Sequence, residues 1–255
     1  MPHAVSRLRS ASLTDSSTRP RLDRGEPRKA RCARCRLIPS HCMCALRPRL
    51  SSRAAVCLLM AEFEPLKPSN TGWLIADLLP ETAAFAWSRT AVDPALLALL
   101  DDPQWQPYVV FPGEFAAAQR VVTALPDGDE GARPDDGGRQ RRRPLFVLLD
   151  GTWSEARKMF RKSPYLDRHP VLSLQPRQLS RYRLRRSIHP HHFCTAEVAA
   201  LCLALAGEPH AAQTLEAYLD VFSGRYLQAR QSVPADPQDA AHRRLRELAA
   251  APVDA

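Results

Sequence analysis

The apolar run at residues 145–149 (LFVLL) constrains the fold of this chain more than any other segment. It is short, continuous and followed by polar residues, which is typical of a strand buried on both faces of a sheet. Similar runs occur at 54–60, 82–87, 108–111 and 171–174, and segments with helical spacing stand between them. Because strands alternate with helices, the sequence predicts an α/β domain with a mainly parallel sheet.

Apolar residues at three- and four-residue spacing indicate where the helices lie. We expect helices at residues 70–79, 94–100, 154–162, 195–205, 214–228 and about 239–249. Asn70 and Thr71 start the first of these helices, and Thr195 and Glu197 start another. Each of these polar residues is open to two interpretations, a helix cap or a functional contact.

Composition divides the chain into segments. Residues 1–30 are rich in Arg, Ser and Pro, which predicts a disordered basic tail. Residues 31–48 contain a cysteine cluster, and residues 49–230 form the main domain. A stretch at 126–143 lacks large apolar residues and is expected to be a flexible insert in that domain. Residues 231–255 form a C-terminal tail.

The positive charge of the chain is concentrated in one segment. The sequence has 36 Lys and Arg against 27 Asp and Glu, a formal net charge of +9, and residues 157–186 hold ten basic residues and one acid. Such a patch suits a polyanion such as RNA, because each neutralised phosphate releases counterions; a solvated arginine-rich face is the alternative. The candidate RNA contacts are Arg157, Lys158, Arg181 and Arg183.

Composition also excludes several classes of protein. A hydrophobic content of 45% is too high for a wholly disordered chain. No apolar run approaches the roughly 18–20 residues that cross a bilayer, and the arginine-containing N-terminus lacks the apolar block of a signal peptide. We therefore expect a cytoplasmic protein with no membrane segment and no evident obligate protein partner.

Four cysteines lie within thirteen residues: Cys32, Cys35, Cys42 and Cys44. Four thiolates at this spacing predict a closed, structural Zn²⁺ site, because clustered cysteines in a reducing compartment bind metal more often than they pair. A redox CxxC pair is the alternative, but the Arg- and Pro-rich flanks do not provide a thioredoxin-like strand and helix. The other cysteines, Cys57, Cys194 and Cys202, lie in apolar runs and are expected to be inert core residues.

The strand at 145–149 is followed by Asp150, Gly151, Thr152 and Trp153. In an α/β sheet, ligands bind at the carboxyl ends of the strands, which favours a catalytic role for Asp150 and Thr152. Trp153 offers a surface on which a base can stack. The alternative is that Asp150 and Thr152 only cap the next helix.

This motif resembles that of the DTW-domain family, the tRNA-uridine aminocarboxypropyltransferases, and the resemblance covers roughly residues 31–230. Other blocks agree in their order along the chain: the cysteine cluster at 32–44, EPLKPSNT at 64–71, FPG at 111–113, SRYRLR at 180–185 and TAE at 195–197. The chain departs from the family pattern at Met60, where His is common, and at residues 194–198, where the family commonly has ST-x-EA and this chain reads CTAEV, with Cys194 in place of Ser. These departures leave the roles of both positions open.

The resemblance implies a SPOUT-like fold with a C-terminal knot that holds S-adenosylmethionine. It also implies transfer of the 3-amino-3-carboxypropyl group of that donor to N3 of a tRNA uridine, with release of methylthioadenosine, within a catalytic domain at 49–230. Asp150 is then the candidate base or orienting acceptor. The candidate donor-binding residues are Phe111, Pro112, Gly113, Arg185, Thr195 and Glu197.

Two other functions remain open at this point. A SPOUT-like RNA methyltransferase would use the same donor but release S-adenosylhomocysteine. A non-catalytic zinc-containing RNA-binding protein would bind tRNA without affinity for S-adenosylmethionine.

Overall fold

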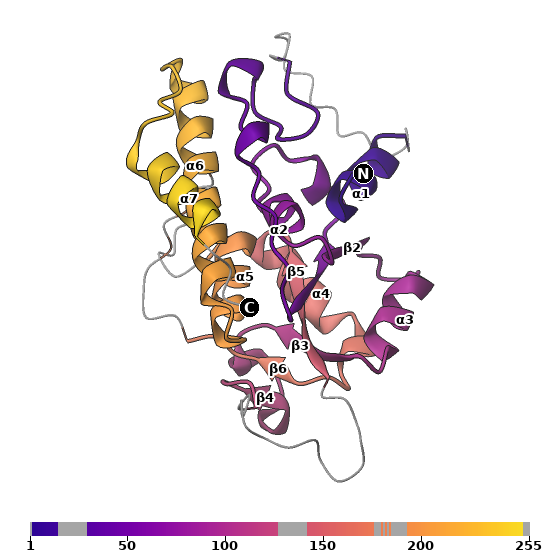
Figure 1. Cartoon of the computed structure of the whole chain (residues 1–255). Helices are drawn as coiled ribbons and strands as arrows, with labels where there is room; N and C mark the ends of the chain where they lie inside the picture. Colours follow the sequence, from indigo (N-terminus) through magenta and orange to yellow (C-terminus); the bar gives the residue numbers. More distant parts are fainter. Residues whose placement is uncertain are drawn as a thin grey trace.

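A single parallel sheet forms the centre of the protein (Figure 1). The computed structural model describes residues 2–14, 30–126, 142–175, 180, 182, 184 and 193–251. Within these residues the strands are β1 (Ala55–Met60), β2 (Ala83–Ala86), β3 (Trp105–Val110), β4 (Val121–Val122), β5 (Arg143–Asp150) and β6 (Val171–Leu172). They lie in the order β2-β1-β5-β3-β6-β4, and each neighbouring pair is parallel. The prediction of an α/β domain with a mainly parallel sheet is confirmed.

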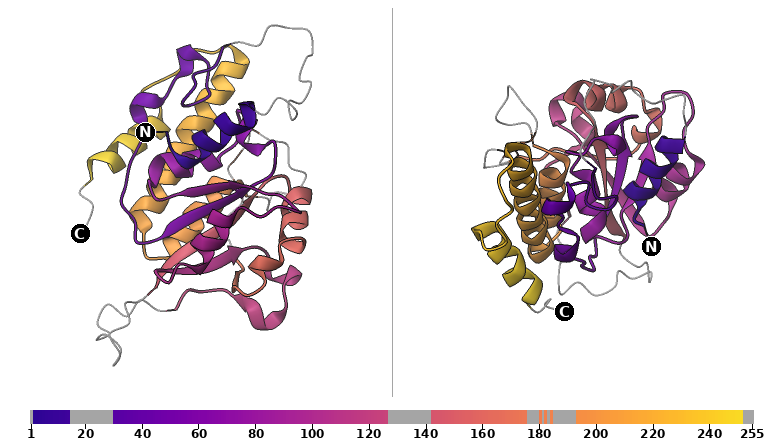
Figure 2. Two further views of the ribbon diagram at one scale, coloured as in Figure 1. Left: turned by 90° about the vertical axis from the view of Figure 1, so that its right-hand side faces the viewer. Right: turned by 90° about the horizontal axis from the view of Figure 1, so that it is seen from above.

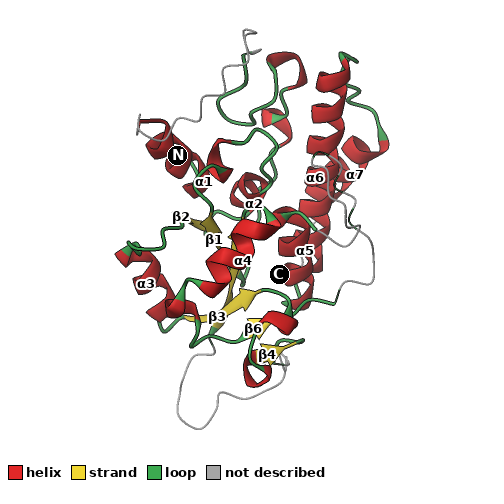
Figure 3. Cartoon of the chain, turned by 180° about the vertical axis from the view of Figure 1, so that it is seen from behind, coloured by secondary structure: helices red, strands yellow, loops and turns green. Residues whose placement is uncertain are grey.

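Helices cover both faces of this sheet (Figures 1–3). They are α1 (Ala4–Thr14), α2 (Gly72–Leu78), α3 (Pro94–Asp101), α4 (Trp153–Arg161), α5 (Thr195–Leu205), α6 (Pro209–Gln231) and α7 (Ala240–Ala250). Short 3₁₀ turns are η2 (Pro39–His41), η3 (Cys44–Leu46), η4 (Glu64–Leu66), η5 (Gly113–Phe115), η6 (Ala118–Arg120) and η7 (Pro164–Leu166). In Figure 1, α5 and α6 lie on one side of the sheet and α3 and α4 on the other.

Successive side chains of β1 point to opposite faces of the sheet, and so they pack into two separate hydrophobic cores. Val56 and Leu58 pack into a core that includes α2, α5 and α6, whereas Cys57 and Leu59 pack into a core that includes α3 and α4. All six residues of β1 are buried, because helices cover both of its faces.

The register of the central strands determines where β1 and β5 end. Met60, the last residue of β1, pairs with Asp150, the last residue of β5. The chain segments that follow these two strands therefore begin side by side at the carboxyl edge of the sheet.

The helices expected from periodicity are present; α5 has the expected bounds, and the others are shifted by a few residues. The helix expected at 214–228 begins earlier, since Pro209 stands in its first turn, where a missing N–H costs no hydrogen bond. It ends at Gln231, and the next residue, Ser232, adopts a left-handed φ of 59°. Within the described residues, no helix combines the length and apolarity that crossing a membrane requires.

The predicted disorder of residues 1–30 is wrong for the first part of this segment. Helix α1 occupies Ala4–Thr14, with Val5 only 1% exposed and in the same core cluster as α2. The Nδ1 atom of His3 accepts a hydrogen bond from the backbone N–H of Ser6, at 3.2 Å. The sequence pattern does not predict this helix, because its large apolar residues are Val5, Leu8 and Leu13, and Leu13 is exposed, so its packing depends on isolated side chains rather than on a stripe. Residues 15–29 lie outside the described residues.

The expected boundary of the insert also changes at its C-terminal end. Arg143 is the first residue of β5, its guanidinium lies 4.6 Å from the ring centroid of Trp105, and it pairs with Glu81 at 2.7 Å. The apolar stem and the ring explain why an arginine can begin a buried strand. Residues 127–141 lie outside the described part of the chain.

If α1 packs on the domain, Val5→Ala should lower the free energy of unfolding by about 2 kcal/mol, because it removes two buried methyl groups and leaves a cavity. Leu13→Ala is the matched control on the same helix, since Leu13 is 40% exposed, and should change stability by less than about 0.5 kcal/mol. Urea unfolding measures both values. Equal effects of the two substitutions would show that α1 does not pack as described.

Candidate active site and candidate metal centre

Asp150 is the centre of a buried hydrogen-bond cluster at the carboxyl edge of the sheet. Its side chain is 2% exposed. Asn70 Nδ2 donates to Asp150 Oδ2 at 2.7 Å, and Thr195 Oγ1 donates to Asp150 Oδ1 at 2.6 Å. A buried carboxylate requires such donors because its charge has lost water. The segment after β1 and the start of α5 are thus joined through the end of β5.

A second buried carboxylate, Glu64, lies in the same cluster. It has no exposed surface, accepts a hydrogen bond from Asn70 Nδ2 at 3.2 Å, and forms an ion pair with Lys67. Asn70 therefore bridges Glu64 and Asp150 with one amide group, while Lys67 supplies a positive charge to Glu64. The Oδ1 atom of Asn70 is buried and finds no donor among the described residues, so this cluster has an unsatisfied acceptor.

Gly72 makes room for the Asp150 side chain. A Cβ atom at Gly72 would lie 2.7 Å from Asp150 Oδ2 and 3.2 Å from a methyl group of Leu58. The carboxylate and the first turn of α2 can approach this closely only because the side chain of residue 72 is a hydrogen atom.

The cap interpretation holds for some of the polar residues that precede helices. Glu197 Oε2 accepts hydrogen bonds from the backbone N–H of Cys194 and from Ser180 Oγ, each at 2.8 Å, which is a capping arrangement at the start of α5. Thr71 Oγ1 accepts from the backbone N–H of Ala196 at 3.2 Å, and its side chain does not cap α2. Thr71 and Glu197 thus both fix the N-terminus of α5.

Thr152 has a capping role, whereas Asp150 does not cap α4. The side chain of Thr152 accepts from the backbone N–H of Glu155 at 3.4 Å, and Glu155 Oε2 accepts from the backbone N–H of Thr152 at 2.7 Å. This reciprocal pair is a capping box. Asp150 and Thr152, which the sequence predicts as one functional motif, thus differ in their contacts: Thr152 caps α4, whereas Asp150 contacts Asn70 and Thr195.

Trp153 belongs to an aromatic cluster beside the strand end. Its ring stacks on Phe111 with 5.5 Å between centroids and 7° between planes, and Phe111 also stacks on Phe160 at 4.4 Å. Phe115 meets Trp153 edge-on at 5.8 Å, and the guanidinium of Arg157 lies 4.9 Å from the Phe115 ring. Trp153 is 39% exposed, so it combines a supported ring with a solvent-facing surface.

The other predicted donor-binding residues lie near this cluster or outside the described residues. Pro112 precedes η5, and Gly113 packs tightly, since a Cβ there would lie 2.8 Å from Val121 and 3.2 Å from Ser173 Oγ. The absence of a side chain at Gly113 therefore allows the backbone to approach Val121 and Ser173 of the protein itself. Arg157 and Lys158 are exposed on α4. Arg181, Arg183 and Arg185 lie outside the described residues.

The four clustered cysteines have the geometry of a tetrahedral metal site. Their Sγ atoms all lie within 4.8 Å of one another, and three of the pairs are separated by 3.6, 3.6 and 3.8 Å. A tetrahedron with Zn–S bonds of about 2.3 Å has sulfur–sulfur edges of about 3.8 Å. The residues therefore fit a zinc ion. Although burial acts to raise it, hydrogen bonds from the backbone N–H groups of Cys35 and Arg34 lower the pKa of Cys32 to about 7, which favours a thiolate ligand.

The cysteine segment packs on the main domain through its own core residues. Cys35, Leu37 and Met43 are buried in the same cluster as β1 and α2. His41 lies outside the sulfur set, because its ring nitrogens make hydrogen bonds with Ser40 Oγ and the carbonyl of Val233, each at 2.9 Å.

Arg36 connects the cysteine segment to the segment after β1. It adopts a left-handed φ of 62°, and its Nη1 donates to the carbonyls of Pro65 and Lys67, at 3.0 and 3.2 Å. Burial and the charge of Arg9 lower the pKa of Arg36 to about 9, while Asp150 and Asp77 act in the opposite direction. A residue between two of the candidate metal ligands, Cys35 and Cys42, thus holds the backbone that carries Glu64 and Asn70.

Sequence reasoning placed Asp150 and Thr195 in the candidate site but did not join them, and it assigned no chemistry to Glu64, Lys67 or Arg36. The available signal was the expected position of residues 64–70 directly after a strand. Parallel strands end at the same edge of a sheet, so this position alone places residues 64–70 on the same edge as Asp150. No local pattern identified Arg36, because its contacts depend on how the cysteine segment packs.

For the cysteine cluster, we expect protein purified without chelator to contain about one zinc ion per chain, since four thiolates complete a tetrahedral site. Cys35→Ser should lower both zinc content and the melting temperature, because structural metal binding contributes folding free energy. Cys202→Ala is the control, since it removes a buried sulfur outside the cluster and should leave the metal in place. Elemental analysis that finds no zinc in the wild type would contradict a zinc centre.

A comparison of the sequence with models of known protein families finds a match, and its range contains the candidate site residues described above. The matched range, 29–227, includes the cysteine segment, the Glu64–Asn70–Asp150 cluster and the start of α5. No solved structure matches the chain significantly. The family model is described as the DTW domain, and because its match covers most of the chain, this protein belongs to the DTW-domain family.

Proposed function

We propose that this protein is a tRNA-uridine aminocarboxypropyltransferase. It transfers the 3-amino-3-carboxypropyl group of S-adenosylmethionine to N3 of a tRNA uridine and releases methylthioadenosine. Membership of the DTW-domain family supports a tRNA-modifying enzyme. The observation that carries the proposal is the buried Asp150 carboxylate beside the unsatisfied Oδ1 of Asn70, at the sheet edge where α/β proteins bind ligands.

The reaction requires a proton acceptor and accurate positioning. Uridine N3 carries a weakly acidic proton, which must leave as the nitrogen attacks the γ-carbon of the donor. Asp150 accepts this proton, and its contact with N3 tightens when the base enters, as catalytic hydrogen bonds do in substrate complexes. The positive sulfur already activates the donor carbon, so most of the acceleration comes from holding that carbon, rather than the methyl group, against N3.

The hydrogen bonds around Asp150 suit this role. Asn70 and Thr195 hold the two carboxylate oxygens in fixed directions. The unsatisfied Oδ1 of Asn70 is placed to accept an N–H from a substrate, and both the uridine and the donor's amino group carry one. Arg185, at the end of the SRYRLR block, is our candidate partner for the donor carboxylate.

The surface beside Asp150 suits RNA. Helix α4 begins at Trp153, the last residue of the motif. It exposes Arg157, Lys158 and Arg161, and Lys162, directly after the helix, is also exposed. Trp153 presents a supported ring at the start of this helix, so an unstacked base has a surface to stack on. Phosphate contacts on α4 supply affinity, while the choice of uridine depends on tRNA shape, with the variable loop as our candidate region.

We also propose a SPOUT-like fold with a C-terminal knot around the donor site, on the basis of family membership. The contact of Thr195 with Asp150 supports this arrangement, because it brings the start of α5 to the end of the central strand.

The by-product tests the reaction class. Incubation of the purified protein with tRNA and S-adenosylmethionine should release methylthioadenosine, detected by liquid chromatography. Release of S-adenosylhomocysteine would instead show a methyltransferase. Binding of tRNA without measurable affinity for the donor would show a non-catalytic RNA-binding protein.

Asp150→Asn should lower the single-turnover rate by about 10²–10⁴, since the amide keeps the shape of the side chain but is not a base. Donor and tRNA affinity should change far less. Asp93→Asn is the control, because Asp93 only caps α3 through the backbone N–H of Ala95, and Asn caps about as well as Asp. If the Asp150→Asn rate falls by less than about threefold, the loss is much smaller than that expected for a general base, and Asp150 is not the base. Loss of donor binding would make Asp150 a binding residue instead.

Replacing Arg157 and Lys158 together by Gln should weaken tRNA binding and reduce the slope of log K against log salt by about one to two phosphate contacts. The matched control replaces Arg243 and Arg246, two exposed cations on α7, by Gln. Filter binding over a range of salt concentrations measures both slopes. Equal, small effects of the two double substitutions would show that α4 is only a solvated basic face.

A further inference from the structure

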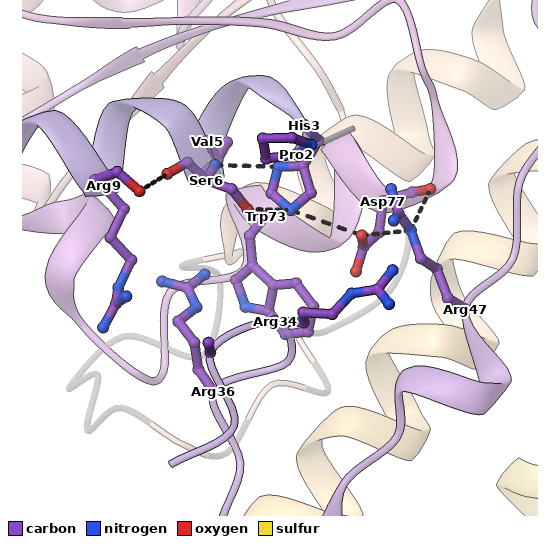
Figure 4. A pocket seen from close by; sticks show the side chains of 12 residues that line it. Pro2, His3, Val5, Ser6, Arg9, Arg34, Arg36, Arg47, Trp73 and Asp77 are labelled. Carbon is purple, nitrogen blue, oxygen red and sulfur yellow. Dashed lines mark hydrogen bonds and ion pairs between the residues drawn. The ribbon is translucent and has the colours of Figure 1, made fainter.

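A cationic cavity lies between α1, the cysteine segment and α2, and Asp150 is not part of its lining (Figure 4). Its volume is about 510 Å³. The charged and aromatic residues that line it are Arg9, Arg34, Arg36, Arg47, Trp73 and Asp77. Segments that are distant in the sequence thus direct several guanidinium groups to one place.

The charges in this cavity do not balance. Asp77 is the one acid among the described residues that line it, and it pairs with Arg47 at 2.6 Å. Burial is the main cause that lowers the pKa of His3 to about 4, so His3 is neutral near pH 7. Arg9, Arg34 and Arg36 have no carboxylate within ion-pair distance in the described part of the chain. Arg34 is exposed, so water screens its charge. Arg9 is half-buried and Arg36 is buried, and these two like charges repel each other unless an anion enters.

Buried donors around the cavity also lack acceptors. Arg36 is 3% exposed and Trp73 is 1% exposed. Among the described residues, however, Arg36 Nη2, Trp73 Nε1 and the buried Nε of Arg9 find no hydrogen-bond partner. Figure 4 shows the N–H side of the Trp73 indole facing Arg36. Buried donors are nearly always satisfied in folded proteins, because an unpaired one loses its hydrogen bond to water.

The rest of the Arg36 side chain is fixed. Its Nη1 donates to the carbonyls of Pro65 and Lys67, and its guanidinium lies 5.1 Å from the centroid of the Trp73 ring. The unpaired Nη2 is therefore held in position by contacts on the other parts of the group, which is the arrangement of a preformed binding site.

We propose that this cavity binds a phosphate group through Arg9, Arg36 and the indole N–H of Trp73. Guanidinium groups match phosphate oxygens in geometry as well as charge, and the three unsatisfied donors need an acceptor with several oxygens. Water would satisfy the donors but not the charges. The cavity is larger than a phosphate ion requires, so it also admits a phosphate carried on a nucleic acid.

This site is separate from the proposed reaction centre and does not depend on the reaction. It has one structural link to that centre, because Arg36 holds the carbonyls of the segment that carries Glu64 and Asn70. A phosphate on Arg36 would therefore also stiffen the segment that contacts Asp150.

The test uses the full chain without S-adenosylmethionine, and titrates it by calorimetry with inorganic phosphate and, separately, by filter binding with tRNA. Arg9→Gln should weaken binding of at least one of these probes by about tenfold or more, as expected for a lost charge-assisted hydrogen bond. Arg7→Gln is the matched control, since Arg7 lies on the same helix but does not line the cavity. Arg36→Gln is a second variant, used if it unfolds cooperatively like the wild type.

The two probes identify the source of the phosphate. If Arg9→Gln weakens the binding of inorganic phosphate, the cavity is a site for free phosphate. If it weakens only the binding of tRNA, and the slope of log K against log salt falls by about one phosphate contact, the cavity binds an RNA phosphate. If Arg9→Gln and Arg7→Gln are indistinguishable with both probes, the proposal is wrong. Neither titration measures group transfer, so this failure is separate from a failure of the proposed function.

Discussion

The hydrogen bonds of Asp150 with Asn70 and Thr195 are the interaction on which the rest of this structure depends. They join the segment after β1, the end of β5 and the start of α5, which belong to distant parts of the sequence. The parallel register that pairs Met60 with Asp150 makes this possible, because both strands end together. The absence of a side chain at Gly72 then leaves room for the carboxylate.

Burying charge at this edge is costly, and the surrounding residues offset that cost. Glu64 and Asp150 would each lose several kcal/mol of hydration without partners. Asn70 donates to both, and Lys67 pairs with Glu64. Arg36 lies in the cysteine segment and fixes the backbone of the segment that carries Glu64 and Asn70, so its hydrogen bonds connect the candidate metal centre to the candidate active site.

Much of the fold follows from the sequence, because strands such as β5 and helices such as α5 have strong local patterns. Asp150 and the cysteine cluster were also identifiable, since each is a compact motif with a chemical reason for its residue types. The position of Asn70 after a strand indicates the same sheet edge as Asp150, but their direct contact also requires β1 and β5 to be neighbours, and periodicity does not encode strand order. Helix α1 was missed for a related reason: Val5 is buried by tertiary contacts, not by an apolar stripe.

The most direct test of the central claim is mass spectrometry of tRNA nucleosides after incubation of unmodified tRNA with the protein and S-adenosylmethionine. We expect one uridine to gain the mass of a 3-amino-3-carboxypropyl group. When the carbon chain of the methionine part of the donor is labelled, the label should appear in that uridine. A uridine that gains only a methyl group, or tRNA that remains unmodified at saturating donor and protein, would contradict the account.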